Sequence, residues 1–400
     1  MKRFRSFFRH IVLLLCLLLT NGVCAQQKDA MLTNIDSVDI SLLTCQPRDA
    51  VYSLYGHTAL RITCKDSGID YTVNYGLFSF NKPYFILRFV FGLTDYEVGA
   101  CSFDDFKYEY ESVGCGVRQQ VLNLTAEEKL AVLKALDVNL LPENRTYRYN
   151  YFYDNCTTRV RDIIVKGIRG NVSYREDYRP TTYREMIHSY NENHRWARFG
   201  NDLLLGVKAD EKISFAQHQF LPFSLSDDFE KAFVTNSAGR VRRLVSQTKW
   251  AVPPGAVVVD TDSMPSPLTC ALIMLALVIG FCVLDCRRGR ITWVFDAFLM
   301  TLSGLAGLIL LAMVFSSHPT VSLNLQILLL NPLALAFAYP TVRGLRHCKP
   351  TLCMTIWPSC IVLFFVGGFL QTYAEGMYIV ALSLLVRILF IVLFIRRNSK

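Results

Sequence analysis

The chain has 400 residues, a formal net charge of +9 and a mean hydropathy of +0.27, and 52% of its residues are hydrophobic. This composition is too apolar for an ordinary soluble protein and is typical of a membrane protein. Much of the positive charge lies in short Arg and Lys clusters beside apolar runs, and no basic-aromatic module is present, so nucleic-acid binding is not expected. The apolar excess follows residue 267, whereas residues 26–250 have the composition of a globular domain.

The N-terminus has the pattern of a cleaved secretory signal. Basic residues precede the apolar run Ile11–Leu19, which is too short to span a bilayer. They are Lys2, Arg3, Arg5, Arg9 and His10. The small residues of Val23-Cys24-Ala25 predict cleavage there, so the mature chain is expected to begin near Gln26. Residues 1–25 are therefore predicted to be a signal peptide, and residues 26–250 an exported domain.

The exported region predicts an α+β domain. Four segments alternate in hydropathy as strands do, namely Ser37–Leu43, Ala59–Thr63, Asp70–Phe80 and Arg118–Leu124. A capping box at Thr125–Glu128 opens a predicted helix. Two more helices are expected from Cys156 onward and over Thr182–Tyr190. Because the strands precede most of the helices, an α+β arrangement is favoured over an alternating one.

The cysteines bear on compartment and chemistry. Thirteen are present, of which five lie in the exported region, and export makes disulfides possible. An odd count leaves at least one thiol free. The local spacing suggests the pairs Cys45–Cys64 and Cys101–Cys115, with Cys156 free. No CxxC or Cys/His metal spacing is present, so neither a metal site nor a cofactor is predicted.

Cys156 is the candidate nucleophile of this region. Asp154 or Asn155 can cap a helix that starts at Cys156. The free N–H groups and the dipole of a helix start stabilise a thiolate, and the same N–H groups can hold an oxyanion. A cysteine nucleophile also needs a base.

His57 is the candidate base, because it follows a glycine and opens an apolar strand that would hold it rigidly. Its second ring nitrogen needs an orienting partner. Asn74 on the next strand is the preferred partner, and Asp70 is the reserve. A simpler interpretation remains open, in which Cys156 is a buried structural cysteine and His57 is hydrogen-bonded in a turn.

Five apolar runs approach or reach the length that crosses a bilayer, after a Pro-rich linker at residues 251–267. They cover residues 268–285, 291–315, 323–340, 351–371 and 377–394. Basic residues lie in the first loop, the third loop and the tail, and Lys and Arg are missing from the second and fourth loops. The positive-inside rule therefore predicts an inner-membrane protein with a periplasmic N-terminal domain and a cytoplasmic C-terminus.

Polar residues within these runs have two interpretations. Charges inside a membrane are costly and often functional, and Arg387 and Asp296 lie within spans. They are expected either to act functionally or to form a structural pair between helices. His318, Asn324 and Asn331 near the second loop could form a polar site, but capping of helix ends beside prolines is favoured.

Several motifs together resemble a known family. They are Tyr55-Gly56-His57-Thr58, Asn74-Tyr75-Gly76-Leu77-Phe78 and Tyr153-Asp154-Asn155-Cys156-Thr157-Thr158. This arrangement resembles the Bacteroidetes-rich DUF4105, or Lnb N-terminal periplasmic domain, family. The segments Phe220-Leu221-Pro222, His318-Pro319 and Asn331-Pro332-Leu333 resemble its companion membrane region. The family pattern is similar to circularly permuted papain-like hydrolases of the NlpC/P60 and lecithin-retinol acyltransferase type, in which the His precedes the Cys. The resemblance implies a nucleophile at Cys156, a base at His57 and an orienting group at Asn74.

Three functions follow as hypotheses. The first is a membrane-anchored thiol hydrolase or acyltransferase that acts on an amide or ester of a peptidoglycan, lipid or lipopeptide substrate. The alternative is a non-catalytic envelope assembly or maturation factor that binds an exported protein partner. Transport by the five spans is disfavoured, because no inverted repeat is visible and charges within the spans are sparse.

Overall fold

A computed structural model describes residues 34–78, 83–174, 178–255 and 264–398, and the predicted signal peptide lies outside these residues. The chain divides into two compact units. The first comprises Met1–Ser79, Asp95–Tyr178 and Phe215–Val258. The second comprises Phe80–Thr94, Arg179–Ser214 and Val259–Lys400, so it includes two segments that precede residue 250 in the sequence.

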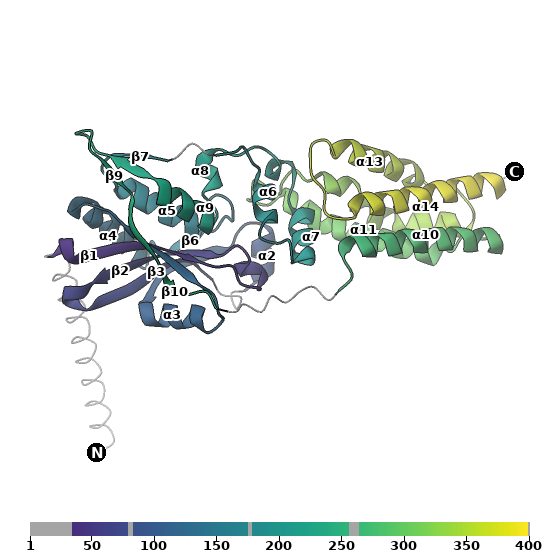
Figure 1. The fold of residues 1–400 in the computed structure, drawn as a ribbon. Helices are drawn as coiled ribbons and strands as arrows, with labels where there is room; N and C mark the ends of the chain where they lie inside the picture. Colours follow the sequence, from purple (N-terminus) through teal and green to yellow (C-terminus); the bar gives the residue numbers. More distant parts are fainter. Residues whose placement is uncertain (1–33, 79–82, 175–177, 256–263, 399–400) are drawn as a thin grey trace, which may run out of the picture. The chain divides into compact units, whose positions relative to one another are not determined.

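An antiparallel seven-stranded sheet forms the centre of the first unit, with the strand order β10-β5-β1-β2-β3-β4-β6 (Figure 1). Its strands are β1 (Val38–Cys45), β2 (His57–Cys64), β3 (Ile69–Leu77), β4 (Asp95–Ser102), β5 (Val117–Leu122), β6 (Thr146–Arg148) and β10 (Val245–Val252). A small sheet contains β7 (Asn171–Ser173), β8 (Phe233–Thr235) and β9 (Val241–Arg243). The four predicted strands are confirmed as β1, β2, β3 and β5, and the other strands were not predicted.

Helices cover both faces of the large sheet, α4, α5 and α9 on one face and α3 on the other (Figure 1). The helices of this unit are α3 (Phe103–Glu111), α4 (Ala126–Leu140), α5 (Cys156–Gly167), α8 (Phe215–His218) and α9 (Pro222–Lys231), with short 3-10 turns at Ile35–Ser37, Val51–Ser53 and Lys65–Ser67. The capping box predicted for α4 is present, since Thr125 accepts from the Glu128 N–H and Glu128 accepts from the Thr125 N–H. The first unit is thus an α+β domain, as predicted.

The alternation of β1 explains why both faces of the sheet are buried. Ile40 and Leu42 belong to the core beneath α4, α5 and α9. Leu43 and Cys45 belong to the core on the opposite face, where they meet Phe106 of α3. Because successive side chains of a strand point to opposite faces, a strand that is apolar at both parities needs a helical layer on each side.

The second unit is a helical bundle. Among the described residues, four segments are long and apolar enough to cross a membrane. They are α10 (Pro267–Arg288), α11 (Trp293–Val314), the segment Leu325–Arg346, which contains the 3-10 helix η5 (Leu325–Leu328) and α12 (Leu333–Arg346), and α14 (Met377–Asn398). A fifth apolar helix, α13 (Cys353–Gly367), is shorter. A helical membrane region with four candidate spans therefore follows the α+β domain in the sequence.

Polar side chains fasten the segment Arg179–Ser214 to the bundle. It contains α6 (Tyr183–His188), α7 (Arg195–Leu204) and the 3-10 helix η4 (Val207–Ala209). Within it, the buried Arg184 binds Asp202 at 2.7 Å and Asp210 at 2.8 Å. Asn324 donates to the Leu203 carbonyl at 2.7 Å, and Gln371 donates to the Leu205 carbonyl at 2.9 Å. These bonds explain why α6 and α7 belong to the second unit.

The predicted disulfides are wrong, since every cysteine of the described residues is free. In the β1–β2 hairpin, Cys45 lies opposite His57 and Cys64 lies opposite Val38. The two cysteines therefore occupy opposite ends of the hairpin, roughly 23 Å apart, whereas a disulfide needs Cα atoms within about 7 Å. Cys101 and Cys115 are free as well, and Cys101 accepts a hydrogen bond from Asn74.

Candidate active site

Cys156 is the first residue of α5, and Asn155 caps this helix. The Asn155 Oδ1 accepts from the N–H groups of Thr157 and Thr158, each at 2.9 Å. In return, the Thr158 hydroxyl oxygen accepts from the Asn155 N–H. The Asn155 Nδ2 donates to the Phe220 carbonyl at 2.9 Å. The cap therefore fixes where the helix begins, and it places the half-buried thiol in the first turn, where the helix dipole favours negative charge.

His57 is the first residue of β2, and its position depends on the glycine before it. Gly56 has a φ of +78°, and a Cβ there would lie 2.6 Å from the Cys45 carbonyl oxygen, so only glycine fits this turn. The His57 Nε2 lies 3.2 Å from the Asn74 Oδ1. Because the Asn74 amide nitrogen donates to the Cys101 Sγ, the Asn74 oxygen is the acceptor and Nε2 carries the proton.

The second ring nitrogen of His57 is then left for Cys156, and the thiol and the imidazole lie close enough for each to shift the pKa of the other. The structure thus brings the three predicted residues together in the order Cys156, His57, Asn74. The Thr58 side chain, 3.0 Å from the Thr157 hydroxyl, joins β2 to the first turn of α5. This contact holds the strand that carries the imidazole against the helix that carries the thiol.

The electrostatics of the pair favour a thiolate and an imidazolium. Burial alone would raise the pKa of Cys156, but the His57 imidazole, the Thr58 N–H and the Thr157 hydroxyl outweigh it, and the thiol pKa is lowered. Burial alone would lower the pKa of His57, but the Cys156 thiolate and the Asn74 side chain outweigh it, and the imidazole pKa is raised. Opposite shifts of two adjacent groups are expected for an ion pair in which each stabilises the charge of the other.

Asp70, the reserve partner, is not part of this site. It accepts two hydrogen bonds from Arg61, at 2.8 and 2.6 Å. It pairs with Thr63 in the β2–β3 ladder, whereas Asn74 pairs with Ala59 near the His57 end. The ladder register therefore favours Asn74 over Asp70.

An aromatic group beside the thiol was not assigned a role from the sequence. Tyr149 stacks on Tyr96 with ring centroids 4.1 Å apart, and Tyr96 stacks on Phe78 at 4.9 Å. Burial raises the pKa values of Tyr147 and Tyr149, and negative charge at Cys156 raises them further. In the sequence, the run of aromatic residues before Cys156 was the only signal for this aromatic group. Sequence alone could not show that β6 pairs with β4, which brings Tyr149 against Tyr96.

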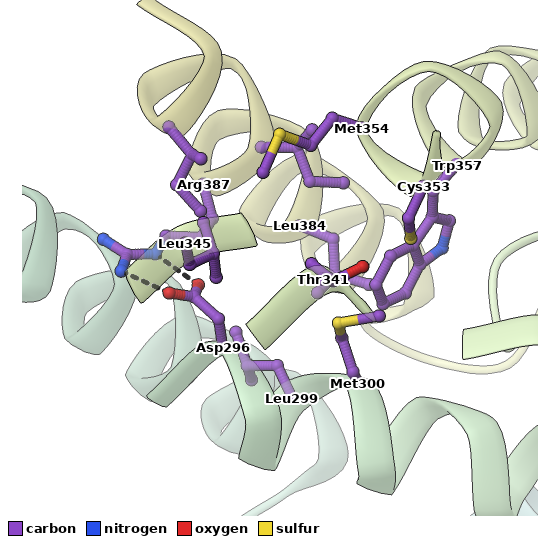
Figure 2. A pocket seen from close by; sticks show the side chains of 12 residues that line it. Asp296, Leu299, Met300, Thr341, Leu345, Cys353, Met354, Trp357, Leu384 and Arg387 are labelled. Carbon is purple, nitrogen blue, oxygen red and sulfur yellow. Dashed lines mark hydrogen bonds and ion pairs between the residues drawn. The ribbon is translucent and has the colours of Figure 1, made fainter. Parts of the chain in front are cut away.

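The second unit contains a separate cluster of charged residues that joins three helices. Arg387 of α14 binds Asp296 of α11 through two bonds of 2.7 and 2.8 Å, and it lies 2.8 Å from Asp285 of α10. Figure 2 shows Arg387 and Asp296 pointing toward each other. Both residues line a cavity of about 40 Å³. Asp285 also accepts a bond from the Thr292 N–H. The structural pair considered for Arg387 and Asp296 is present, and Asp285 extends it.

The polar residues near the second membrane loop act as helix caps. Asn324 accepts from the Gln326 N–H at the start of η5, and Asn331 accepts from the Leu333 N–H at the start of α12. His318 lies elsewhere, with its ring 6.3 Å from that of Phe89. The three residues therefore do not converge on one site, and the capping interpretation is the one that the geometry favours.

Comparison with known proteins gives two family matches. Residues 26–189 match the Lnb N-terminal periplasmic domain, and residues 259–399 match the Lnb transmembrane domain. Neither the search of curated proteins nor the search of solved structures gives a match. The chain therefore belongs to the Lnb family, as a membrane-anchored protein with an N-terminal periplasmic domain.

Proposed function

We propose that this chain is a membrane-anchored thiol hydrolase or acyltransferase that acts on an amide or ester of the cell envelope, on a peptidoglycan, lipid or lipopeptide substrate. The observation that carries the proposal is the placement of Cys156 at a capped helix start beside His57, which in turn lies 3.2 Å from the Asn74 Oδ1. Cys156 is the nucleophile, His57 is the acid and base, and Asn74 is a positioning residue. A Cys–His pair oriented by a third polar group is the geometry that nucleophilic acyl transfer requires.

The reaction would proceed in two steps, acylation of Cys156 and then transfer of the acyl group to water or to an acceptor. The Cys156 thiolate attacks the carbonyl carbon, and the N–H groups of the helix start stabilise the oxyanion that forms. The His57 imidazolium gives its proton to the leaving amine or alcohol, which departs as the acyl thioester forms. Neutral His57 then removes a proton from water or from an acceptor amine or hydroxyl, which attacks the thioester and regenerates the thiolate when the product leaves.

The order of the site residues supports a circularly permuted papain-like fold for this domain. His57 and Asn74 lie on neighbouring antiparallel strands that precede α5 and Cys156, which is the reverse of ordinary papain order. The packing of α5 on β2 and β3 supports the same assignment, because it lets a helix-borne thiol meet a strand-borne imidazole.

Contacts at both ends of α13 support five spans rather than four. Near its start, Met354 packs on a cluster that holds Ile291, before α11, and Ile395, in the last turn of α14. Beyond its end, Gln371 accepts from the Leu325 N–H at 2.7 Å, at the start of η5. The helix therefore runs between the two ends of the bundle. With α13 as a span, all basic loops fall on one side, which supports a cytoplasmic C-terminus in the inner membrane.

The proposed topology also implies a division of the chain into a signal peptide, a periplasmic region and a linker. Residues 1–25 are a cleaved signal peptide, residues 26–250 lie on the periplasmic side, and residues 251–267 connect them to the spans. The odd number of spans agrees with a periplasmic domain at one end and a cytoplasmic tail at the other.

The first experiment measures the reactivity of Cys156 in the full-length protein held in nanodiscs. Alkylation by iodoacetamide at neutral pH is followed by mass spectrometry of the Cys156 peptide, which separates it from the other cysteines. His57→Ala should slow this alkylation by about tenfold or more, since an ordinary thiol near pKa 8.5 is only a few per cent ionised at pH 7. Alkylation of the Cys64 peptide, which lies far along the hairpin from His57, should not change.

The opposite result would contradict the role of Cys156 as a nucleophile. If Cys156 does not react in the wild-type protein, or if His57→Ala leaves its rate unchanged, the thiol site is not activated. In that case the non-catalytic assembly factor is favoured, and Cys156→Ser should then support growth as well as the wild-type chain in a complementation assay.

A further inference from the structure

The connection between β3 and β4 carries a short and unusually apolar helix, α2 (Phe85–Val90). Its outward side chains are large, and Ile86 is 77% exposed, Leu87 57% and Phe89 45%. Tyr84 before the helix is 78% exposed, and Leu93 after it is 43% exposed. Between residues 83 and 93, Arg88 is the only charged side chain. A contiguous cluster of exposed apolar side chains usually marks a surface that binds another protein or a membrane.

Contacts within the second unit place α2 beside the end of a membrane helix. The Ser317 N–H donates to the Phe91 carbonyl at 3.0 Å, and Ser317 follows the end of α11 at Val314 by three residues. Gly92 has a φ of +67°, and a Cβ there would lie 3.2 Å from atoms of both Ser317 and His318. The close packing at Gly92 therefore holds α2 at the level where α11 leaves the membrane.

The side of the membrane follows from chain order. The periplasmic domain precedes α10, so α10 crosses inward and α11 returns outward. The loop after α11, residues 316–322, contains no Lys or Arg, as expected for an outer loop. α2 therefore lies at the periplasmic end of the bundle. Phe315, at the same end, is 73% exposed and would face lipid there.

We propose that α2, with Tyr84 and Leu93, is an interfacial element that inserts its apolar side chains into the outer leaflet of the membrane that the bundle spans. The occupant of this surface is lipid, at the boundary between headgroups and acyl chains. Short aromatic and aliphatic segments with a positive charge and no acidic residue bind this boundary, because apolar side chains leave water while the cation stays near the headgroups.

The test places a tryptophan on α2 and asks whether lipid or water reaches it. Ile86→Trp is compared with Tyr108→Trp on α3, which is similarly exposed at 74% and lies in the first unit. Both full-length variants are held in nanodiscs, and the fluorescence of the wild-type chain, which has four tryptophans, is subtracted. Lipids brominated near the carbonyl end of the acyl chain should quench most of the Ile86→Trp signal, while acrylamide in water should quench it far less than Tyr108→Trp.

Two outcomes overturn the proposal. If acrylamide quenches both variants equally and brominated lipid quenches neither, α2 lies in water. If neither quencher reaches Ile86→Trp, protein covers α2, from this chain or from a second copy. Leu87→Trp repeats the measurement in case Ile86→Trp does not fold. None of these readouts depends on Cys156, so a failure here is distinct from a failure of the thiol chemistry.

Discussion

The Cys156–His57 pair and the Arg387–Asp296–Asp285 cluster both place ionisable groups of opposite kind beside each other, but their surroundings differ. In the membrane cluster, Arg387 meets two carboxylates and is 2% exposed. In the periplasmic domain, Cys156 and His57 stay half-buried at the rim of the sheet. The first arrangement pairs a buried cation with two buried carboxylates, whereas the second leaves both of its residues partly exposed.

This difference is what distinguishes a stabilising ion pair from the reactive pair that we propose for Cys156 and His57. Removing one partner from a fully buried pair leaves an uncompensated charge, so its main effect is on folding. Removing one partner from a partly exposed pair lets water solvate the other, so its main effect is on the protonation of the remaining group. The variants below test this distinction, beginning with the largest expected effect.

Arg387→Leu should destabilise the bundle by about 3–5 kcal/mol, because Asp296 and Asp285 would remain buried without a cation. The measurement is the midpoint of thermal unfolding of the full-length protein in nanodiscs. Arg397→Leu is the matched control, since Arg397 is exposed at the end of α14 and should leave the midpoint unchanged.

The folded fraction of Arg387→Leu should keep wild-type alkylation of Cys156. A variant that unfolds like the wild type would show that water or lipid solvates the two carboxylates, and the contrast between the two pairs would be lost. Adding Asp296→Asn to Arg387→Leu should recover part of the lost stability, because it removes one of the uncompensated charges.

The pH dependence of Cys156 alkylation should show the ion pair directly. Because the thiol pKa is lowered, the rate should begin to rise below the ordinary thiol range near about 8.5. Transfer of an acyl group also needs the imidazolium, whose pKa is raised, so turnover should fall as the pH rises through the His57 pKa. Turnover should therefore be bell-shaped, with its limbs at the Cys156 and His57 titrations.

Both shifts also affect stability. The lowered thiol pKa contributes stability at high pH that is lost as the pH falls through the folded Cys156 pKa, and the raised imidazole pKa contributes stability at low pH that is lost as the pH rises through the folded His57 pKa. In His57→Ala the rising limb of alkylation should move to the ordinary thiol range or above it. An alkylation profile identical to the wild type would show that His57 does not stabilise the thiolate.

The parts of this site that could be predicted from sequence are those that local chemistry determines. Asn155 before Cys156 is a capping signal, and Gly56 before His57 marks a turn that opens a strand. Which side chain lies beside His57 depends on the register between β2 and β3, and sequence alone does not determine that register. The structure shows that the register places Asn74, and not Asp70, near His57. The register of β1 against β2 also shows that the Cys45–Cys64 disulfide, suggested by close spacing in sequence, is wrong.

The segment that contains α2 and the segment that contains α6 and α7 show a second limit. Hydropathy identified the apolar helices of the membrane, but it could not show that residues before position 250 pack with them. The buried Arg184, with Asp202 and Asp210, looks in sequence like three surface charges. Only the fold shows that they face one another, because Arg184 lies 18 residues from Asp202 and 26 residues from Asp210 in the chain.

The smallest expected effect distinguishes the two possible partners of His57. Asn74→Ala removes the acceptor for the His57 Nε2 proton, so a hydrogen bond worth about 0.5–1.5 kcal/mol is lost and alkylation of Cys156 at neutral pH should slow by roughly twofold to tenfold. Asp70→Asn removes only the ion pair with Arg61, in which the Asp70 side chain is 40% exposed. It should lower the free energy of unfolding by less than about 1 kcal/mol and leave alkylation of Cys156 unchanged. Equal effects of the two substitutions on alkylation would mean that both act through the stability of β3, and that His57 is oriented by the strand itself rather than by the side chain of Asn74.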